Sequence, residues 1–112
     1  MAPQDPLPPT VRREGDAAVI VPTGALDLAS APLLERELQA LAAVPLVIVD
    51  LRSVEHVDST GLNALLRGRQ WAMDSGREFA VVRGGEQVQR LMDLTGVADV
   101  LTLVDKPEEL LS

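Results

Sequence analysis

Short apolar runs separated by polar turns mark the strands of this sequence, and apolar residues at wider spacing mark its helices. Strands are predicted at 11–14, 17–23, 46–49, 78–82 and 100–104. Gly15-Asp16 separates the first two runs, which predicts a tight turn and a β-hairpin. The run at 46–49 is continuously apolar and rich in β-branched residues, so we expect this strand at the centre of the sheet, buried on both faces.

Apolar residues spaced three and four apart predict about four helices, one of them a short terminal helix at 107–111. Ser30 begins the first helix, with Pro32 in its first turn, and Gly96 ends the third. Residues 54–57 are expected to form a loop. Because helices alternate with strands after the hairpin, the chain is predicted to have an α/β fold with a mixed, mostly parallel sheet.

The second predicted helix opens at Asp58 and ends before Gly76. Its expected buried stripe contains Leu62, Leu65, Leu66 and Met73, interrupted only by Arg69. The opposite face carries Asn63, Arg67, Gln70 and Asp74. Residues on that face cannot contribute to the core, so we expect them to be exposed and free to contact a partner. Trp71 is expected to pack at the edge of the core.

The composition is that of one globular domain with a distinct N-terminal segment. The chain has 112 residues, of which 46% are hydrophobic and 24% charged. Four of the first ten residues are proline, so we predict a flexible arm at 1–10 and a folded domain at 11–112. The sequence shows neither a signal peptide nor an apolar run long enough to span a membrane. A cytoplasmic protein is therefore expected.

Charge and residue types exclude several classes of partner. The net charge of −7 disfavours nucleic acid and anionic membranes, because both would be repelled. One Trp, one Phe and no Tyr provide no stacking surface for single-stranded nucleic acid. A basic protein surface is the better complement. Since the chain has no cysteine, it has no disulfide, thiolate nucleophile or cysteine-based metal site.

Enzyme and metal chemistry are also disfavoured. His56, Asp58 and Ser59 are neighbours in sequence, which is not the spatial convergence that a catalytic triad requires. Asp27, Asp50 and Asp58 are scattered carboxylates without the spacing of a metal-binding motif. No cofactor fingerprint is present. We therefore predict a protein that is not an enzyme and that has no metal or cofactor.

The tetrapeptide Asp58-Ser59-Thr60-Gly61 places two hydroxyl groups where a helix begins. The N–H groups of a first helical turn are unpaired and the helix dipole is positive there, so a phosphate on Ser59 or Thr60 would be accommodated without unfolding. The alternative is purely structural, since Asp, Ser and Thr are the favoured N-cap residues of any helix. These four residues alone leave both interpretations open.

Three segments occur in a specific order and spacing: Gly24-Ala25-Leu26-Asp27 with Ser30-Ala31, then Val47-Ile48-Val49-Asp50-Leu51 leading to Asp58-Ser59-Thr60-Gly61-Leu62, and Val88 to Gly96. Together they resemble the STAS family, the fold of bacterial anti-sigma factor antagonists. The resemblance covers nearly all of the chain outside the proline-rich segment. It implies a STAS fold with an N-terminal hairpin.

The resemblance also implies a partner-switching mechanism. Ser59 would be phosphorylated by a cognate anti-sigma factor that is itself a serine/threonine kinase, with Asp58 orienting it and Thr60 as the second choice of acceptor. The unphosphorylated antagonist would bind the kinase and free a sigma factor, and a phosphatase would reset the phosphorylated form. We expect the partner to contact Asp27, Asn63, Arg67 and Gln70, and the unbound protein to be a monomer.

A second function fits the same family resemblance. The chain would then be a constitutive STAS subunit of a larger assembly, such as a lipid-transport or stressosome-like complex, in which Ser59 would only cap a helix. The intact hydroxyl motif favours the switch. Asn63-Ala64 stands where small or aliphatic residues are common in the family, so the identity of the partner stays open.

Overall fold

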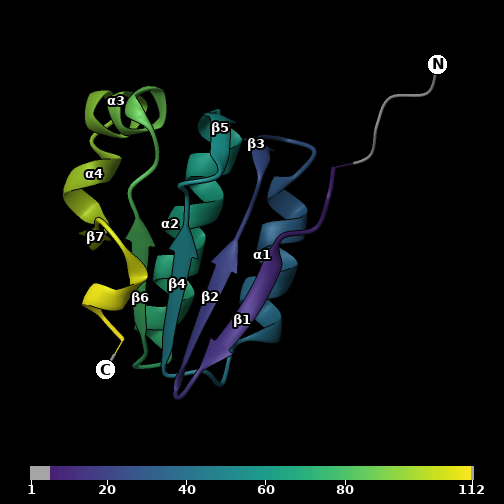
Figure 1. Cartoon of the computed structure of the whole chain (residues 1–112), viewed down its shortest axis with the longest axis vertical. Coiled ribbons are helices and arrows are strands. Elements are labelled where there is room, and N and C mark those ends of the chain that lie inside the picture. The colour runs from purple at the N-terminus through teal and green to yellow at the C-terminus, as the bar shows by residue number, and fades with distance from the viewer. Residues whose placement is uncertain (1–5, 112) are drawn as a thin grey trace.

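The computed structural model describes residues 6–111 (Figure 1). The strands are β1 (Thr10–Glu14), β2 (Ala17–Val21), β3 (Gly24–Leu26), β4 (Leu46–Asp50), β5 (Val54–Val57), β6 (Glu78–Val82) and β7 (Leu103–Val104). The helices are α1 (Ala31–Ala40), α2 (Ser59–Asp74), α3 (Glu86–Leu94), α4 (Val97–Val100) and the 3₁₀ turn η1 (Pro107–Glu109). None of the helices in the described range is long and apolar enough to cross a membrane.

The main sheet has the strand order β1-β2-β4-β6-β7. β1 and β2 are antiparallel, and Gly15 in the turn between them has a left-handed backbone (φ +60°), which favours glycine. The other three strand pairs are parallel. These pairings confirm the predicted α/β fold with a mixed, mostly parallel sheet and an N-terminal hairpin. β4 is the central strand, as its apolar run predicted.

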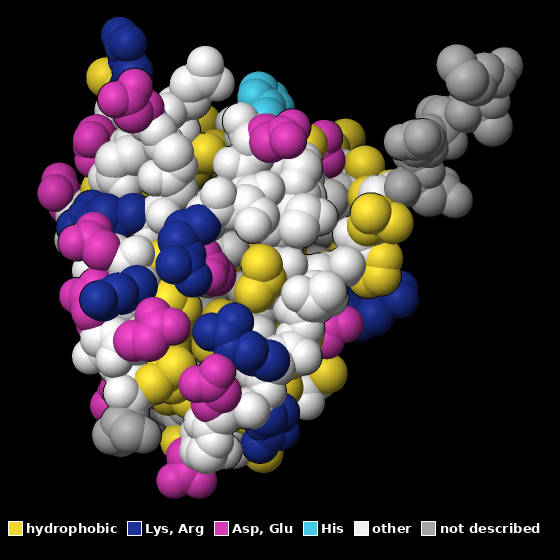
Figure 2. All heavy atoms as spheres, viewed as in Figure 1, with side chains coloured by type: hydrophobic (Ala, Val, Ile, Leu, Met, Phe, Trp, Pro, Cys, Tyr) yellow, Lys and Arg dark blue, Asp and Glu magenta, His cyan; other side chains and the backbone are white. Residues whose placement is uncertain are grey.

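The two faces of the main sheet are covered differently. α1 and α2 lie side by side on one face (Figure 1) and bury the main core, which includes Ile20, Leu34 and Leu65. On the other face Val19, Ile48 and Val82 are also fully buried. Figure 2 shows charged side chains of both signs interspersed over this second face. Below these charges, partly buried apolar residues pack against the three buried ones: Val21, Leu46, Val104, Leu110 and Leu111.

Residues 54–57 form a strand and not the predicted loop. β5 pairs in parallel with β3 in a separate two-stranded sheet at one end of the molecule (Figure 1). Both segments are short and about 30 residues apart in sequence, so neither carries a recognisable periodicity of its own. This small sheet leads directly into α2.

Other boundaries differ from the predictions in smaller ways. The last strand is only Leu103–Val104, because α4 occupies the start of the predicted run. The predicted terminal helix is a 3₁₀ turn, Pro107–Glu109. Thr10, which was expected in the arm, is the first residue of β1. The rest of the predicted arm falls partly on residues 1–5, which lie outside the described range.

The buried face of α2 is made largely of small residues, which the expected stripe missed. Gly61, Ala64, Gly68 and Ala72 are buried together with Leu62 and Leu65. A Cβ atom on Gly68 would lie 2.9 Å from the Phe79 ring and 3.0 Å from Leu38, so α2 packs closely on β6 and α1. Met73, expected in the core, is 55% exposed. Trp71 packs against the edge of the core, as expected.

Candidate functional site at the start of helix α2

Asp58 is the N-cap of α2. Its backbone is extended, and its Oδ1 accepts a hydrogen bond from the Gly61 N–H at 3.0 Å. The Leu62 N–H donates to the Asp58 carbonyl at 3.0 Å, which closes the first turn. A carboxylate in this position also lies favourably in the field of the helix dipole. Capping, the structural role that Asp, Ser or Thr could have taken here, is therefore performed by Asp58.

Ser59 is the first residue of α2 and is exposed. Within the described residues its hydroxyl makes no hydrogen bond, so it is not used to hold the helix together. Thr60, one residue further on, is half-buried. Ser59 thus presents a solvent-facing nucleophile at a helix N-terminus, where an added phosphate would find unpaired N–H groups.

Gly61 permits the close contact that positions this turn. A Cβ atom there would lie 2.2 Å from the carbonyl oxygen of Leu26, at the end of β3. The Asp58 N–H donates a hydrogen bond of 3.2 Å to the same oxygen. Because only glycine lacks a Cβ, Gly61 is the residue that lets α2 begin against the backbone of β3.

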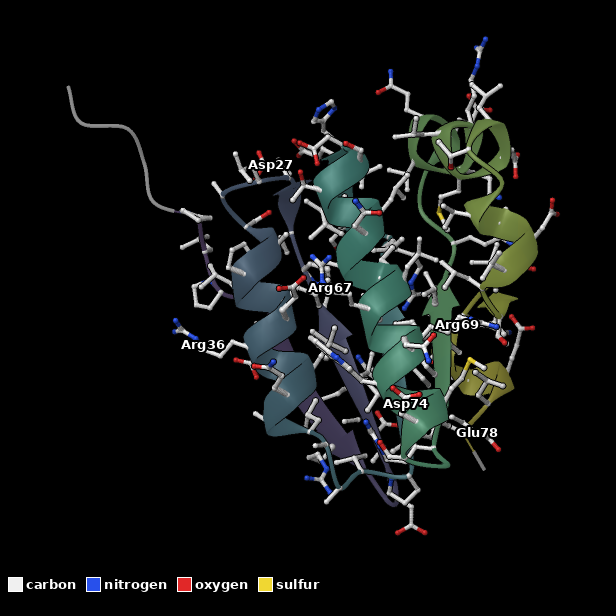
Figure 3. All side chains as sticks on the ribbon, turned by 180° about the vertical axis from the view of Figure 1, so that it is seen from behind. Asp27, Arg36, Arg67, Arg69, Asp74 and Glu78 are labelled. Atoms are coloured by element: carbon white, nitrogen blue, oxygen red, sulfur yellow. The ribbon has the colours of Figure 1, made fainter. Side chains whose placement is uncertain are left out.

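Asp27 lies next to this contact, in the loop between β3 and α1, and Figure 3 shows it near the N-terminal end of α2. Its Oδ1 accepts hydrogen bonds from the N–H groups of Ala29 and Ser30, both at 3.1 Å. Ser30 Oγ donates to the Ala25 carbonyl at 2.7 Å and accepts from the Asp27 N–H at 2.9 Å. Asp27 therefore fixes the shape of the loop beside Ser59.

The predicted partner-binding face of α2 is only partly free. Asn63 is exposed. Arg67 forms an ion pair with Glu35 of α1 (Figure 3), and Gln70 donates a hydrogen bond of 2.8 Å to Asp74. Arg67 is exposed, as expected, but its pair with Glu35 was not predicted, because the spacing along α2 defines its exposed face and does not reveal that α1 lies alongside it.

The other singled-out polar residues do not converge on Ser59. His56 is an exposed residue of β5, and no hydrogen bond joins it to Ser59 in the described range. Asp50 is buried at the end of β4 and forms a bidentate pair with Arg52, with Nη2 2.7 Å from Oδ2. Burial raises the pKa of Asp50, but the hydrogen bonds and charge of Arg52 outweigh it, so the pKa is below its ordinary value. Sequence reasoning missed this pair, although Asp-x-Arg after a buried strand is its signal.

The sequence is similar to known regulators. It is 30% identical over 98 residues to the anti-sigma-B factor antagonist of Bacillus subtilis (strain 168), a match that covers 87% of this chain and 89% of that protein. An anti-sigma factor antagonist from Mycobacterium paratuberculosis is 26% identical, with a TM-score of 0.83 over 97% of this chain and 94% of that one.

More distant solved structures share the fold. SpoIIAA, a Bacillus anti-sigma factor antagonist solved in unphosphorylated and phosphorylated forms, has a TM-score of 0.70 at 14% identity in each; the phosphorylated match covers 91% of this chain and 95% of that one. A sulfate transporter family protein from Wolinella succinogenes has a TM-score of 0.76 at 17% identity, covering 88% and 84%. The sequence pattern of the STAS domain matches residues 8–110. The chain therefore belongs to the STAS domain family.

Proposed function

We propose that this chain is an anti-sigma factor antagonist controlled by phosphorylation of Ser59. In its unphosphorylated form it binds a kinase-type anti-sigma factor in the cytoplasm and releases a sigma factor. The similarity to the Bacillus subtilis and Mycobacterium paratuberculosis antagonists supports the regulatory class. The protein is the substrate of the kinase in this scheme and not itself an enzyme.

The observation that carries this proposal is that Asp58 caps α2 while the neighbouring Ser59 hydroxyl takes no part in capping. The constitutive-subunit alternative assigns Ser59 to capping, but Asp58 already caps α2. Ser59 is exposed, and its hydroxyl makes no hydrogen bond within the described residues. A group that the helix does not need is free to be a kinase substrate, and this favours the switch over a purely structural role.

The proposed reaction is a simple phosphoryl transfer. Ser59 Oγ attacks the γ-phosphorus of ATP bound to the kinase, an O–P bond forms, and the bond to the leaving ADP breaks. The hydroxyl proton passes to a base on the kinase. Asp58 is engaged by the Gly61 N–H, so it orients the turn and leaves the kinase to supply the base and Mg²⁺. A phosphatase reverses the modification by hydrolysis.

Phosphorylation would end binding through charge. A phosphate carries about −1.5 to −2 charges near neutral pH and would sit on a chain with a net charge of −7. Placed at a helix N-terminus it does not disrupt the helix, because the dipole and unpaired N–H groups favour it. Repulsion therefore arises at the interface with the nucleotide-bearing kinase, and the switch is local electrostatics.

We place the kinase-binding surface around Ser59, extending over Asp27 and along α2 through Asn63, Arg67 and Gln70. These positions span about 16 Å of helix from Ser59 to Gln70 at 1.5 Å per residue. Arg67 contributes through its pair with Glu35, which joins α1 and α2 on this face. The unbound protein is proposed to be a monomer.

Substitution of Ser59 tests the proposal. Purified wild type, Ser59→Ala and Thr60→Ala are incubated with candidate kinase-type anti-sigma factors, ATP and Mg²⁺, and phosphate incorporation is mapped by mass spectrometry. We expect wild type and Thr60→Ala to be labelled at Ser59, and Ser59→Ala to be unlabelled. The free energy of unfolding of Ser59→Ala should stay within about 0.5 kcal/mol of wild type, because Asp58 supplies the cap.

Two outcomes would contradict this assignment. Undiminished labelling of Ser59→Ala would place the acceptor elsewhere, with Thr60 examined first. If candidate kinases bind the wild-type protein equally with and without ATP and none of them labels it, the result would favour the constitutive assembly subunit.

A further inference from the structure

Two of the most exposed large apolar side chains, Leu7 and Leu28, belong to segments that meet at one hollow. Among the described residues Leu7, Leu94 and Leu28 are 75%, 74% and 73% exposed. Leu7 lines a hollow of about 320 Å³ together with Asp27 and Ala29, the residues on either side of Leu28. Single exposed apolar residues need no explanation, but two of them on segments that form one hollow suggest an interaction site.

The loop that carries Leu28 is held in one shape by its own hydrogen bonds. Asp27 Oδ1 accepts hydrogen bonds from the N–H groups of Ala29 and Ser30, and both bonds span Leu28. Ser30 Oγ ties the loop back to the Ala25 carbonyl. The apolar side chain is thus presented on a preorganised backbone, which reduces the entropy lost when a partner binds it.

The same loop is joined to the turn that carries Ser59. The Leu26 carbonyl, two residues before Leu28, accepts the Asp58 N–H at 3.2 Å. Gly61 brings the first turn of α2 against that carbonyl without space for a Cβ atom. Leu28 and Ser59 therefore belong to one connected unit, and a protein that reaches Ser59 meets the Leu28 loop as well.

We propose that Leu28 is the apolar anchor through which this chain docks on its kinase-type anti-sigma factor. The inference rests on the proposed function and adds a residue that the Ser59 motif does not include. Asp27 precedes the anchor in sequence, and the Asp58 N–H is bonded to the Leu26 carbonyl two residues before it, so the complementary surface is an apolar pocket with a cationic rim. Leu7 lies at the edge of the same surface.

Docking and phosphoryl transfer are separable in this arrangement. Leu28 does not take part in the chemistry at Ser59 Oγ, and its loss leaves the hydroxyl, the cap and the Gly61 contact intact. A variant without the anchor binds more weakly but is still modified when the kinase is in excess. Such a split between affinity and modification would not follow from damage to the fold or to the acceptor.

The experiment compares two substitutions of equally exposed leucines. Leu28→Ser removes the proposed anchor, and Leu94→Ser removes a side chain of matched exposure from α3. The probe is a kinase-type anti-sigma factor that labels Ser59 of wild-type protein, and binding is measured by calorimetry with ADP and Mg²⁺. We expect Kd to rise at least tenfold for Leu28→Ser and less than twofold for Leu94→Ser, with both variants labelled at Ser59 at saturating kinase.

Leu28→Met is included because it keeps an apolar side chain of similar size, so its Kd should stay within about threefold of the wild-type value. Thermal unfolding of each variant confirms that it is folded. Equal Kd values for Leu28→Ser and wild type, with Ser59 still labelled, would overturn the anchor and leave the proposed function standing. If no kinase labels Ser59, the proposed function fails and the anchor fails with it.

Discussion

At the scale of single residues, adjacent polar side chains in this protein have different tasks. Asp58 caps α2 while the neighbouring Ser59 hydroxyl is left exposed. From the sequence, Asp58, Ser59 and Thr60 were all candidates for the N-cap of α2, because their residue types have similar preferences for that position. The extended backbone of Asp58 and its hydrogen bond to Gly61 identify Asp58 as the cap. The motif at 58–61 therefore indicates where the site lies, whereas the structure is needed to assign a role to each of its residues.

The buried Asp50 and the half-exposed Arg52 form an ion pair whose contribution to stability depends on pH. With its pKa lowered, Asp50 contributes stability that is present above the unfolded-state pKa and is lost as pH falls through the folded-state pKa. Arg52→Ala removes the side-chain hydrogen bonds and the charge that lower this pKa but keeps the backbone N–H bond to Asp50, so the folded-state pKa of Asp50 should be higher than in wild type.

We expect Arg52→Ala to lower the free energy of unfolding by about 1–3 kcal/mol at pH 7, since a charged acceptor loses its side-chain partner. Between pH 4 and pH 7 the deficit relative to wild type should grow. Urea denaturation at several pH values measures it, with Arg13→Ala, an exposed arginine on β1, as the control. A deficit independent of pH would contradict the assigned role of Arg52.

At the scale of elements, the sequence predicted what repeats along the chain and missed what depends on distant contacts. The apolar runs located β1, β2, β4 and β6, and the caps located both ends of α2. The pairing of β3 with β5 was missed because neither segment has a periodicity that shows it. The Arg67–Glu35 pair was missed because it depends on how two helices are placed in space.

The buried face of α2 gives an element-scale prediction. Leu65 is fully buried and Met73 is 55% exposed, although both belong to the stripe expected from sequence. We expect Leu65→Ala to lower the free energy of unfolding by about 2–5 kcal/mol, because it creates a cavity in the core. Met73→Ala should change it by less than about 0.5 kcal/mol. Urea denaturation of both variants checks this, and similar losses would mean that the packed face of α2 is wrongly assigned.

At the scale of the whole molecule, charge dominates the expected response to modification. The chain carries a net charge of −7, and the proposed phosphate on Ser59 would add to it without touching the core. Stability and binding should therefore respond differently. The fold has a stabilising place for the phosphate at the start of α2, whereas an interface of complementary charge loses an attraction.

We expect the protein phosphorylated at Ser59 to keep its thermal midpoint within about 4 °C of the unmodified form, or to exceed it. Its affinity for the kinase should fall at least tenfold, and the loss should be smaller at about 0.5 M salt than at about 0.05 M salt because salt screens the repulsion. Differential scanning calorimetry and titration of both forms measure these quantities. A large drop in midpoint would instead indicate that the switch works by unfolding.

The contact at Gly61 has a consequence for how this protein can change by mutation. The atom that blocks a side chain there is the carbonyl oxygen of Leu26, which every residue at that position would also carry. A genetic search for suppressors of Gly61→Ala would therefore find none among single side-chain replacements at position 26. Relief would require a different path of the backbone around 22–30, through an insertion or deletion, and such a change would displace the loop that lies beside Ser59.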